Sequence, residues 1–320
     1  MNISKKSVKK ISLGIIILLI VSTLGFSWYV AGLLVNKPLS ERPQFCMVPA
    51  RTCVIRLLKK FHMEDEKIVV ELTSFDGTKL RGLYFPSKNN AAVIVQHGYG
   101  GHMGSVMHIA HMLHEQGYGV ITMDLRAHGS SGGEQVTFGK NEARDMQYVF
   151  DYLKNRKEVN PDKIGLYGWS LGGATVLLHG DHNKEVKSVI ADSPFDAINY
   201  ENMQQFTDTP WPFPALFRFF SSIRSDTDFD KNAPINNLDA YQNKPLFLMI
   251  AGSDQVVDPQ SGERLLKKLN NSTLQIWREP TFGHIRFSFD AKNKFSRKVL
   301  RFFNTTLSPS PLKTGSSYEQ

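Results

Sequence analysis

A serine between two glycines, at the junction of a strand-like and a helix-like segment, constrains this chain more than any other feature. The pentapeptide at 168–172 reads Gly-Trp-Ser-Leu-Gly, follows the apolar run 163–167 and precedes the helix-like segment 173–179. Its glycines remove the Cβ atoms that would clash in so tight a turn. The helix that follows points the positive end of its dipole at the same place. This context predicts a nucleophilic Ser170, although a glycine-rich turn can also contain a serine by chance.

Short apolar strands alternate with helices over most of the chain. Strands are predicted at 67–73, 79–85, 91–96, 119–124, 163–167, 186–191, 245–251 and 273–277. Helices are predicted at 105–116, 141–157, 173–179, 261–269 and 292–303. Asp76-Gly77 separates the first two strands and is typical of a hairpin turn. Such alternation predicts an α/β fold with a mostly parallel central sheet flanked by helices on both faces.

The alternation stops between residues 193 and 243. This interval contains the aromatic run Trp211-Pro-Phe-Pro-Ala-Leu-Phe-Arg-Phe-Phe220, which is too apolar for a solvated linker. One interpretation is a helical excursion that packs against the sheet. The other is a short helical lid over an apolar substrate site, in which Trp211, Phe213 and Phe217 would contact the substrate.

The N-terminal region contains a long uncharged segment. Residues 11–35 carry no charge, and four lysines lie between residues 5 and 10. A helix of that length spans a hydrocarbon core about 30 Å thick, and Trp28 and Tyr29 near its end favour the membrane interface. The lysines predict a cytoplasmic N-terminus and an extracytoplasmic domain. A cleaved signal peptide is the alternative, but the apolar run is long for one and no convincing small-x-small cleavage site follows.

These patterns divide the chain into five parts. The predicted parts are a basic N-terminus (1–10), a transmembrane anchor (11–35), a tether (36–64), the α/β domain (65–305, with the lid-like insertion 193–243) and a disordered tail (306–320). The two cysteines, Cys46 and Cys53, lie in the tether. An exported domain could pair them, whereas a helix would hold them about 10 Å apart, too far for a disulfide. Both possibilities stay open.

The charge and histidine patterns favour neither nucleic acid nor metal. The net charge is +8, but four of the cations precede residue 11 and the rest form no basic–aromatic stripe. The histidines at 102, 108, 111 and 114 drift round a helix and make no tight ligand set. The acidic residues at 226, 228 and 230 lack the glutamate that would complete a calcium loop. We therefore expect no nucleic-acid partner, no metal and no organic cofactor.

A nucleophilic serine needs a base and an acid that orients the base. In folds with this serine turn, the acid and then the histidine follow the serine along the chain. His284 lies in a glycine-containing loop after the last predicted strand, and Asp254 directly follows another strand. These positions predict a Ser170–Asp254–His284 triad. Two rivals for the acid remain: Asp258, which helix capping explains well, and Asp192, which also ends a strand.

Two backbone N–H groups should complete the site as an oxyanion hole. One is expected from Leu171, directly after the serine, and the other from Tyr99, in the loop that follows the strand 91–96. His97 begins that loop and precedes Ser170, so we expect it to be a structural hydrogen-bonding residue.

Together these motifs resemble the α/β-hydrolase superfamily. The resemblance covers about residues 65–305 and rests on His97-Gly98, Asp124-x-Arg126-x-His-Gly129-x-Ser131, Gly168-x-Ser170-x-Gly172, Gly252-x-Asp254-x-x-Val257 and Gly283-His284. Within the superfamily the chain resembles membrane-anchored members of the serine-aminopeptidase-like and lysophospholipase-like group. The resemblance implies the triad above and a structural role for the segment 124–131. The loop at residue 97 lacks the long glycine run of some lipases.

The expected function is therefore a membrane-anchored serine hydrolase. Its expected substrates are carboxylic esters of apolar or lipid-like acyl groups. The alternative enzymatic function is hydrolysis of peptides or other amides by the same triad. The alternative non-enzymatic function is a scaffold that tethers a partner.

Overall fold

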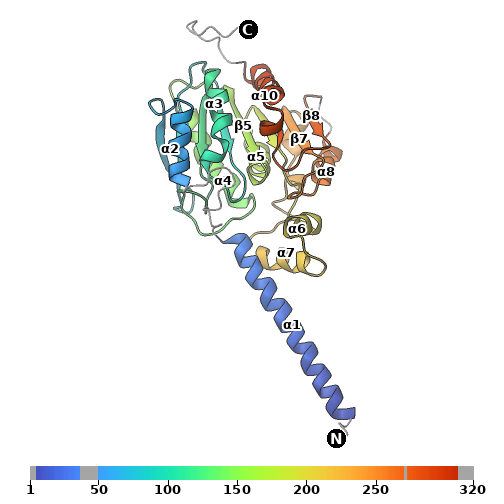
Figure 1. Ribbon diagram of the computed structural model, residues 1–320. Coiled ribbons are helices and arrows are strands. Elements are labelled where there is room, and N and C mark those ends of the chain that lie inside the picture. Colours follow the sequence, from blue (N-terminus) through green and yellow to red (C-terminus); the bar gives the residue numbers. More distant parts are fainter. Residues whose placement is uncertain (1–4, 37–49, 270–271, 309–320) are drawn as a thin grey trace.

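One eight-stranded sheet forms the centre of the molecule (Figure 1). The computed structural model describes residues 5–36, 50–269 and 272–308. The strands, in the spatial order β1-β2-β4-β3-β5-β6-β7-β8, are β1 (Ile68–Thr73), β2 (Lys79–Phe85), β4 (Gly119–Met123), β3 (Ala92–Gln96), β5 (Ile164–Trp169), β6 (Ser188–Asp192), β7 (Leu246–Ala251) and β8 (Gln275–Glu279). Only the β1–β2 and β2–β4 pairs are antiparallel. The predicted mostly parallel sheet is confirmed.

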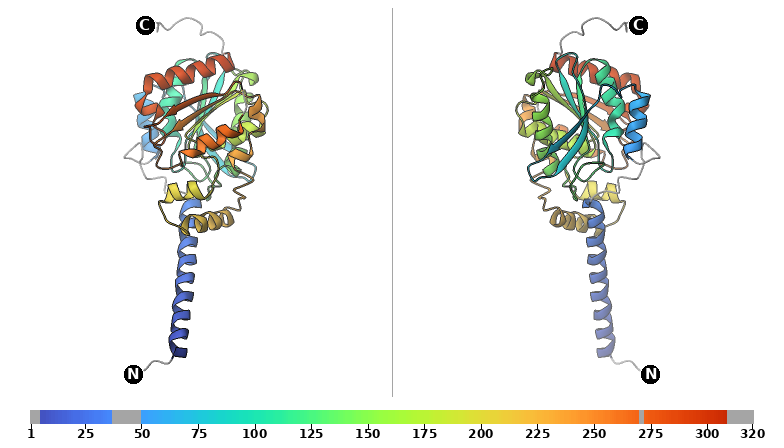
Figure 2. Two further views of the ribbon diagram at one scale, coloured as in Figure 1. Left: turned by 90° about the vertical axis from the view of Figure 1, so that its right-hand side faces the viewer. Right: turned by 90° about the vertical axis from the view of Figure 1, so that its left-hand side faces the viewer.

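Helices cover both faces of the sheet because successive side chains of its apolar strands point to opposite sides. In β3, Val93 and Val95 join one buried cluster, and Ile94 joins the other. Helices of the first cluster are α2 (Ala50–Lys60), α3 (Met107–Glu115), α9 (Phe287–Asp290) and α10 (Lys292–Leu307). Helices of the second cluster are α4 (Lys140–Lys154), α5 (Leu171–His182) and α8 (Gln260–Lys268). The two layers stand on either side of the sheet in Figure 2.

The interval between β6 and β7 folds into helices rather than strands. It contains α6 (Tyr200–Thr207), α7 (Phe213–Arg224), η3 (Pro234–Asn236) and η4 (Asp239–Gln242). Two further short turns are η1 (Met103–Val106) and η2 (Pro161–Lys163). In Figure 1, α6 and α7 lie below the sheet, beside the upper end of the long helix α1 (Lys5–Val35).

Helix α1 projects from the domain as a single rod (Figure 2). Its segment Ser12–Val35 is long and apolar enough to cross a membrane. The last turns of α1 are built into the domain: Ala31 and Val35 are fully buried. The Tyr99 hydroxyl donates to the Leu34 carbonyl at 2.9 Å, and the Val136 N–H donates to the Val35 carbonyl at 2.7 Å. The end of α1 is therefore part of the fold.

Parts of the predicted tether and termini lie outside the described residues, namely 1–4, 37–49 and 309–320. They include Cys46 and most of the tail expected to be disordered. Cys53, in α2, is disulfide-bonded, so the alternative in which this cysteine forms no disulfide is wrong.

Candidate active site

Ser170 occupies a strained turn between β5 and α5. Its φ and ψ are 53° and −122°, a left-handed φ that non-glycine residues adopt rarely. A Cβ on Gly168 would collide with the Gly172 carbonyl, and one on Gly172 would lie 2.5 Å from the His97 carbonyl oxygen. The turn thus packs against itself and against the end of β3. This packing explains why the pentapeptide needs both glycines.

His284 and Asp254 form a hydrogen-bonded pair. The distance from His284 Nδ1 to Asp254 Oδ2 is 2.6 Å, and the side chains are 15% and 3% exposed. The other carboxylate oxygen, Oδ1, accepts from the backbone N–H groups of Val256 and Val257 at 2.8 and 2.9 Å. When the Nδ1–H of His284 donates to Asp254, Nε2 is the ring nitrogen that can accept a proton. Chain order and the position of each residue after a strand predicted this pair.

Hydrogen bonds to backbone carbonyls connect the loop that carries Asp254 to the loop that carries His284. The Ser253 N–H donates to the Phe282 carbonyl at 3.0 Å, and the Ser253 hydroxyl donates to the Pro280 carbonyl at 2.8 Å. Helix α6 is attached to the acid loop, since the Gln205 amide donates to the Asp254 carbonyl at 3.1 Å. The acid, the base and the insertion are therefore connected.

The loop after β3 passes directly beside Ser170. A Cβ on Gly98 would lie 2.9 Å from Ser170 Cβ, so only glycine allows this approach. His97 is fully buried, donates from Nδ1 to the Gly98 carbonyl at 2.8 Å, and accepts at Nε2 from the Leu125 N–H at 3.0 Å. Burial lowers the pKa of His97 well below its usual value. The expected structural role of His97 agrees with these bonds.

The rivals for the acid have other partners. Asp258 accepts from the Gln260 N–H at 3.1 Å and pairs with Arg264 at 2.6 Å, as expected for a residue at a helix start. Asp192 is fully buried and accepts from the Tyr167 hydroxyl at 2.9 Å. Burial raises the pKa of Asp192 to about 6. Neither carboxylate is hydrogen-bonded to His284.

The segment 124–131 braces neighbouring loops. Asp124 accepts from the Met103 N–H at 2.6 Å and from the Ser130 N–H at 2.7 Å. His128 accepts at Nε2 from the Gly100 N–H at 3.0 Å. The segment thus supports the loop 97–101.

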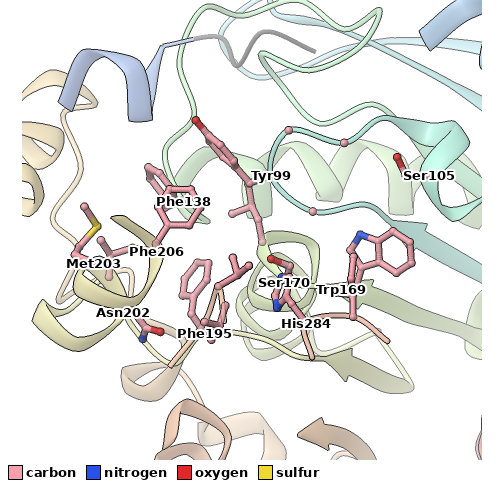
Figure 3. Close-up of a pocket in the computed structure, with 18 of the residues that line it drawn as sticks. Tyr99, Ser105, Phe138, Trp169, Ser170, Phe195, Asn202, Met203, Phe206 and His284 are labelled. Carbon is pink, nitrogen blue, oxygen red and sulfur yellow. The ribbon is translucent and has the colours of Figure 1, made fainter. Parts of the chain in front are cut away.

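Ser170 and His284 line one cavity of about 760 Å³ (Figure 3). Tyr99 and Leu171 line it too. Residues on its wall that sequence analysis missed include Gly32, Leu33, Asn36, Phe138, Phe195, Ile198, Asn202, Met203 and Phe206. The predicted Trp211, Phe213 and Phe217 do not line this cavity: Phe213 and Phe217 contact Phe26 of α1, and Trp211 is 76% exposed. The aromatic run signalled an apolar wall, but Met203 and Phe206 of α6 and the loop residues Phe138, Phe195 and Ile198 supply that wall. Within the ranges that the structure describes, no three histidine, cysteine or acidic side chains are grouped to hold a metal ion.

Comparison with known proteins assigns the family. Residues 104–310, which contain Ser170, Asp254 and His284, match the prolyl oligopeptidase family. The chain belongs to this family. Among solved structures, the Pyrococcus furiosus esterase Pf2001 is similar to this prolyl oligopeptidase family member, with a TM-score of 0.66 and 26% identity over 78% of this chain and 94% of its own.

Curated relatives of this prolyl oligopeptidase family member include two uncharacterised bacterial proteins. YqkD of Bacillus subtilis is 27% identical over 210 residues, which cover 63% of this chain and 68% of YqkD. YfhR of Escherichia coli K12 is 32% identical over 152 residues, which cover 42% of this chain and 53% of YfhR. The match therefore spans only about half the length of YfhR. Family and fold together make the chain a hydrolase of the α/β-hydrolase superfamily.

Proposed function

We propose that the chain is a membrane-anchored serine hydrolase that cleaves carboxylic esters with apolar acyl groups. One observation carries the proposal: a serine in a strained strand–helix turn shares a cavity with a histidine that is hydrogen-bonded to a buried aspartate. This is the arrangement that nucleophilic catalysis by serine requires.

The proposed mechanism assigns one step to each group. His284 Nε2 takes the proton of Ser170 as Oγ attacks the acyl carbonyl carbon. The N–H groups of Leu171 and Tyr99 bind the oxyanion that forms, and loss of one such donor typically raises the barrier by about 3 kcal/mol. His284 then gives the proton to the leaving alcohol, and an acyl-enzyme remains. Water, deprotonated by His284, then attacks the acyl-enzyme, the acid leaves, and His284 returns the proton to Ser170 Oγ. Asp254 stabilises His284 whenever it is charged.

The wall of the cavity favours an apolar acyl group. Phe138, Phe195, Ile198, Met203 and Phe206 line it, and apolar walls bind apolar substituents by removing them from water. The similarity to an esterase supports ester cleavage. The name of the family favours peptide bonds instead, so hydrolysis of peptide amides is the second candidate.

A fluorophosphonate probe tests the nucleophile. Wild-type protein should be labelled and Ser170→Ala should not. Ser105→Ala is the matched control, because Ser105 also lines the cavity but should not react. Labelling of Ser170→Ala equal to wild type would reject the proposed role of Ser170. The second test compares the turnover of p-nitrophenyl esters of increasing chain length with the turnover of peptide amides. It separates the two candidate activities, because faster cleavage of the amides would overturn the preference for esters.

The contacts of α1 support a retained anchor over a cleaved signal peptide. Cleavage after the apolar segment would remove the buried Ala31 and Val35, and it would remove Gly32 and Leu33 from the cavity wall. We propose that the lysine-rich end lies in the cytoplasm and the hydrolase domain outside. In a bacterial host, alkaline phosphatase fused after residue 40 should be active, and an inactive fusion would contradict this orientation.

A further inference from the structure

Helix α7 exposes a continuous apolar stripe. Ala215, Phe219 and Ile223 follow one another at intervals of four residues and are all exposed, Phe219 to 56% and Ile223 to 53%. Trp211, just before the helix, is 76% exposed. The buried residues Pro214, Phe217 and Ser221 occupy the opposite side of the helix. A helix in water carries polar side chains on its outer face, so this apolar stripe (Trp211, Ala215, Phe219 and Ile223) indicates another surrounding medium.

The helix α7 packs on the last turns of α1. The Phe26 and Phe213 rings lie 5.7 Å apart, and the Trp28 and Phe220 rings lie 5.6 Å apart. Figure 2 shows α7 lying across α1. If α1 crosses a membrane, α7 therefore lies along the plane of that membrane, as interfacial amphipathic helices do.

The length of α1 sets the depth of α7. The side chains of α1 are all exposed from Ser12 to Ser22, and extensive burial begins only after Phe26. At about 1.5 Å per residue, the segment 12–26 spans roughly 22 Å, which is less than the hydrocarbon core of about 30 Å. The span must therefore continue to about Ala31. Because α7 packs on this same stretch, it lies at the depth of the outer edge of the bilayer.

Charged and aromatic groups at this level fit a membrane interface. The Arg224 guanidinium lies 4.5 Å from the centre of the Trp28 ring. The buried Nε of Arg224 has no hydrogen-bond acceptor among the described residues. Tryptophan rings favour the headgroup level, and an arginine side chain at that level can pair with a lipid phosphate.

The cavity opens beside the same helices. Leu33 of α1 and Phe206 of α6 line it, yet they are 58% and 38% exposed. Residues that both line a cavity and contact the surroundings form its mouth. Leu33 and Phe206 form an apolar side of this mouth, and Asn36 and Arg286, which also line the cavity and are exposed, add polar groups to it. The apolar side lies about one turn beyond Trp28 along α1.

We propose that the apolar stripe of α7 is embedded in the outer interface of the membrane that α1 crosses, and that the cavity opens at this lipid surface. An acyl chain then passes from the bilayer to Ser170 without crossing bulk water. This inference rests on the proposed anchored hydrolase and identifies its substrate as a membrane-resident acyl ester.

The contact can be measured without turnover. The full chain carrying Phe219→Cys, labelled with the environment-sensitive dye NBD, is reconstituted in vesicles of phosphatidylcholine and phosphatidylglycerol. Val69→Cys is the matched control, since Val69 is an apolar side chain that is 72% exposed on β1. We expect blue-shifted emission at position 219 that lipids spin-labelled near the headgroup quench, and water-like, unquenched emission at position 69. Water-like emission at position 219 would overturn the proposal. A blue shift that spin-labelled lipids do not quench would also overturn it and would indicate a protein partner instead.

A second variant links the contact to catalysis. Phe219→Ser/Ile223→Ser changes only exposed side chains and should fold normally. It should lower turnover of a long-chain ester in vesicles about tenfold and leave turnover of a water-soluble short-chain ester unchanged. Equal loss on both esters, or no loss on either, would contradict access from the membrane. Failure of wild-type protein to hydrolyse any ester would reject the proposed function instead, and the NBD signal would still report on the membrane contact.

Discussion

Individual side chains hold the backbone around Ser170 without any assigned part in its chemistry. His97 connects the loop after β3 to Leu125, and His128 connects Gly100 of that loop to the segment 124–131. Each bond uses a ring nitrogen as acceptor, which only an unprotonated nitrogen provides. The low pKa of the buried His97 keeps that nitrogen available at neutral pH. The proposed oxyanion loop is thus fixed before any substrate binds, as electrostatic stabilisation of a transition state requires.

Asp192 should make the stability of the protein depend on pH. Burial raises its pKa from 3.8 to about 6, so between these values the folded state binds more protons than the unfolded state. Stability must then fall as pH rises through this window, by about 3 kcal/mol for a shift of about two units. Asp192→Asn should abolish this part of the pH dependence. Unfolding of detergent-solubilised protein by urea from pH 4 to pH 7 measures it, and parallel pH curves for wild type and variant would contradict the assignment.

The turn between β5 and α5 depends on the absence of a side chain at Gly172. A Cβ there would meet the backbone carbonyls of His97 and Gln96 at 2.5 and 2.6 Å. Gly172→Ala should improve helix propensity by about 1 kcal/mol, but the collision with rigid backbone costs about 1–3 kcal/mol and moves Ser170. We expect a net loss of stability and about 100-fold lower ester turnover.

Gly283→Ala is the matched control for this effect. A Cβ on Gly283 would meet nothing closer than 3.8 Å, although the residue adjoins His284. Thermal unfolding and turnover should stay near those of wild type. If Gly172→Ala and Gly283→Ala behaved alike, a steric collision in the turn between β5 and α5 would not explain the glycine at position 172.

Local pattern predicted the regular elements well and the long-range contacts poorly. The predicted strands and the helices of the α/β domain are present because each combines a clear apolar period with turn signals at its ends. The four-residue α9 was missed, since it is too short to show a period. The pair of Asp254 and His284 followed from chain order and strand ends. The partner of the aromatic run did not, because Phe213 and Phe217 pack on Phe26 of a helix far away in sequence.

Over the molecule as a whole, the helix predicted as an anchor is also a structural part of the hydrolase domain. A Cβ on Gly32 would lie 2.9 Å from an Arg224 nitrogen, so the Arg224 side chain of α7 packs directly on α1 at this glycine. The Tyr99 hydroxyl donates to the Leu34 carbonyl, which connects α1 to the proposed oxyanion loop. If α1 crosses a membrane, this attachment fixes the position of the cavity relative to the bilayer surface.

Removing α1 should therefore destabilise the domain as well as release it. A chain that starts at residue 37 loses the buried Ala31 and Val35 and exposes the face of α7 that contacts Phe26. We expect aggregation without detergent and, in detergent, a melting temperature lower by roughly 10 °C. A chain that starts at residue 23 is the control, because it loses only residues without buried side chains in the described part of α1. It should melt like the full chain in the same detergent, since every buried side chain in the described part of α1 lies beyond that point. Equal melting temperatures for the two truncated chains would show that α1 is only a tether.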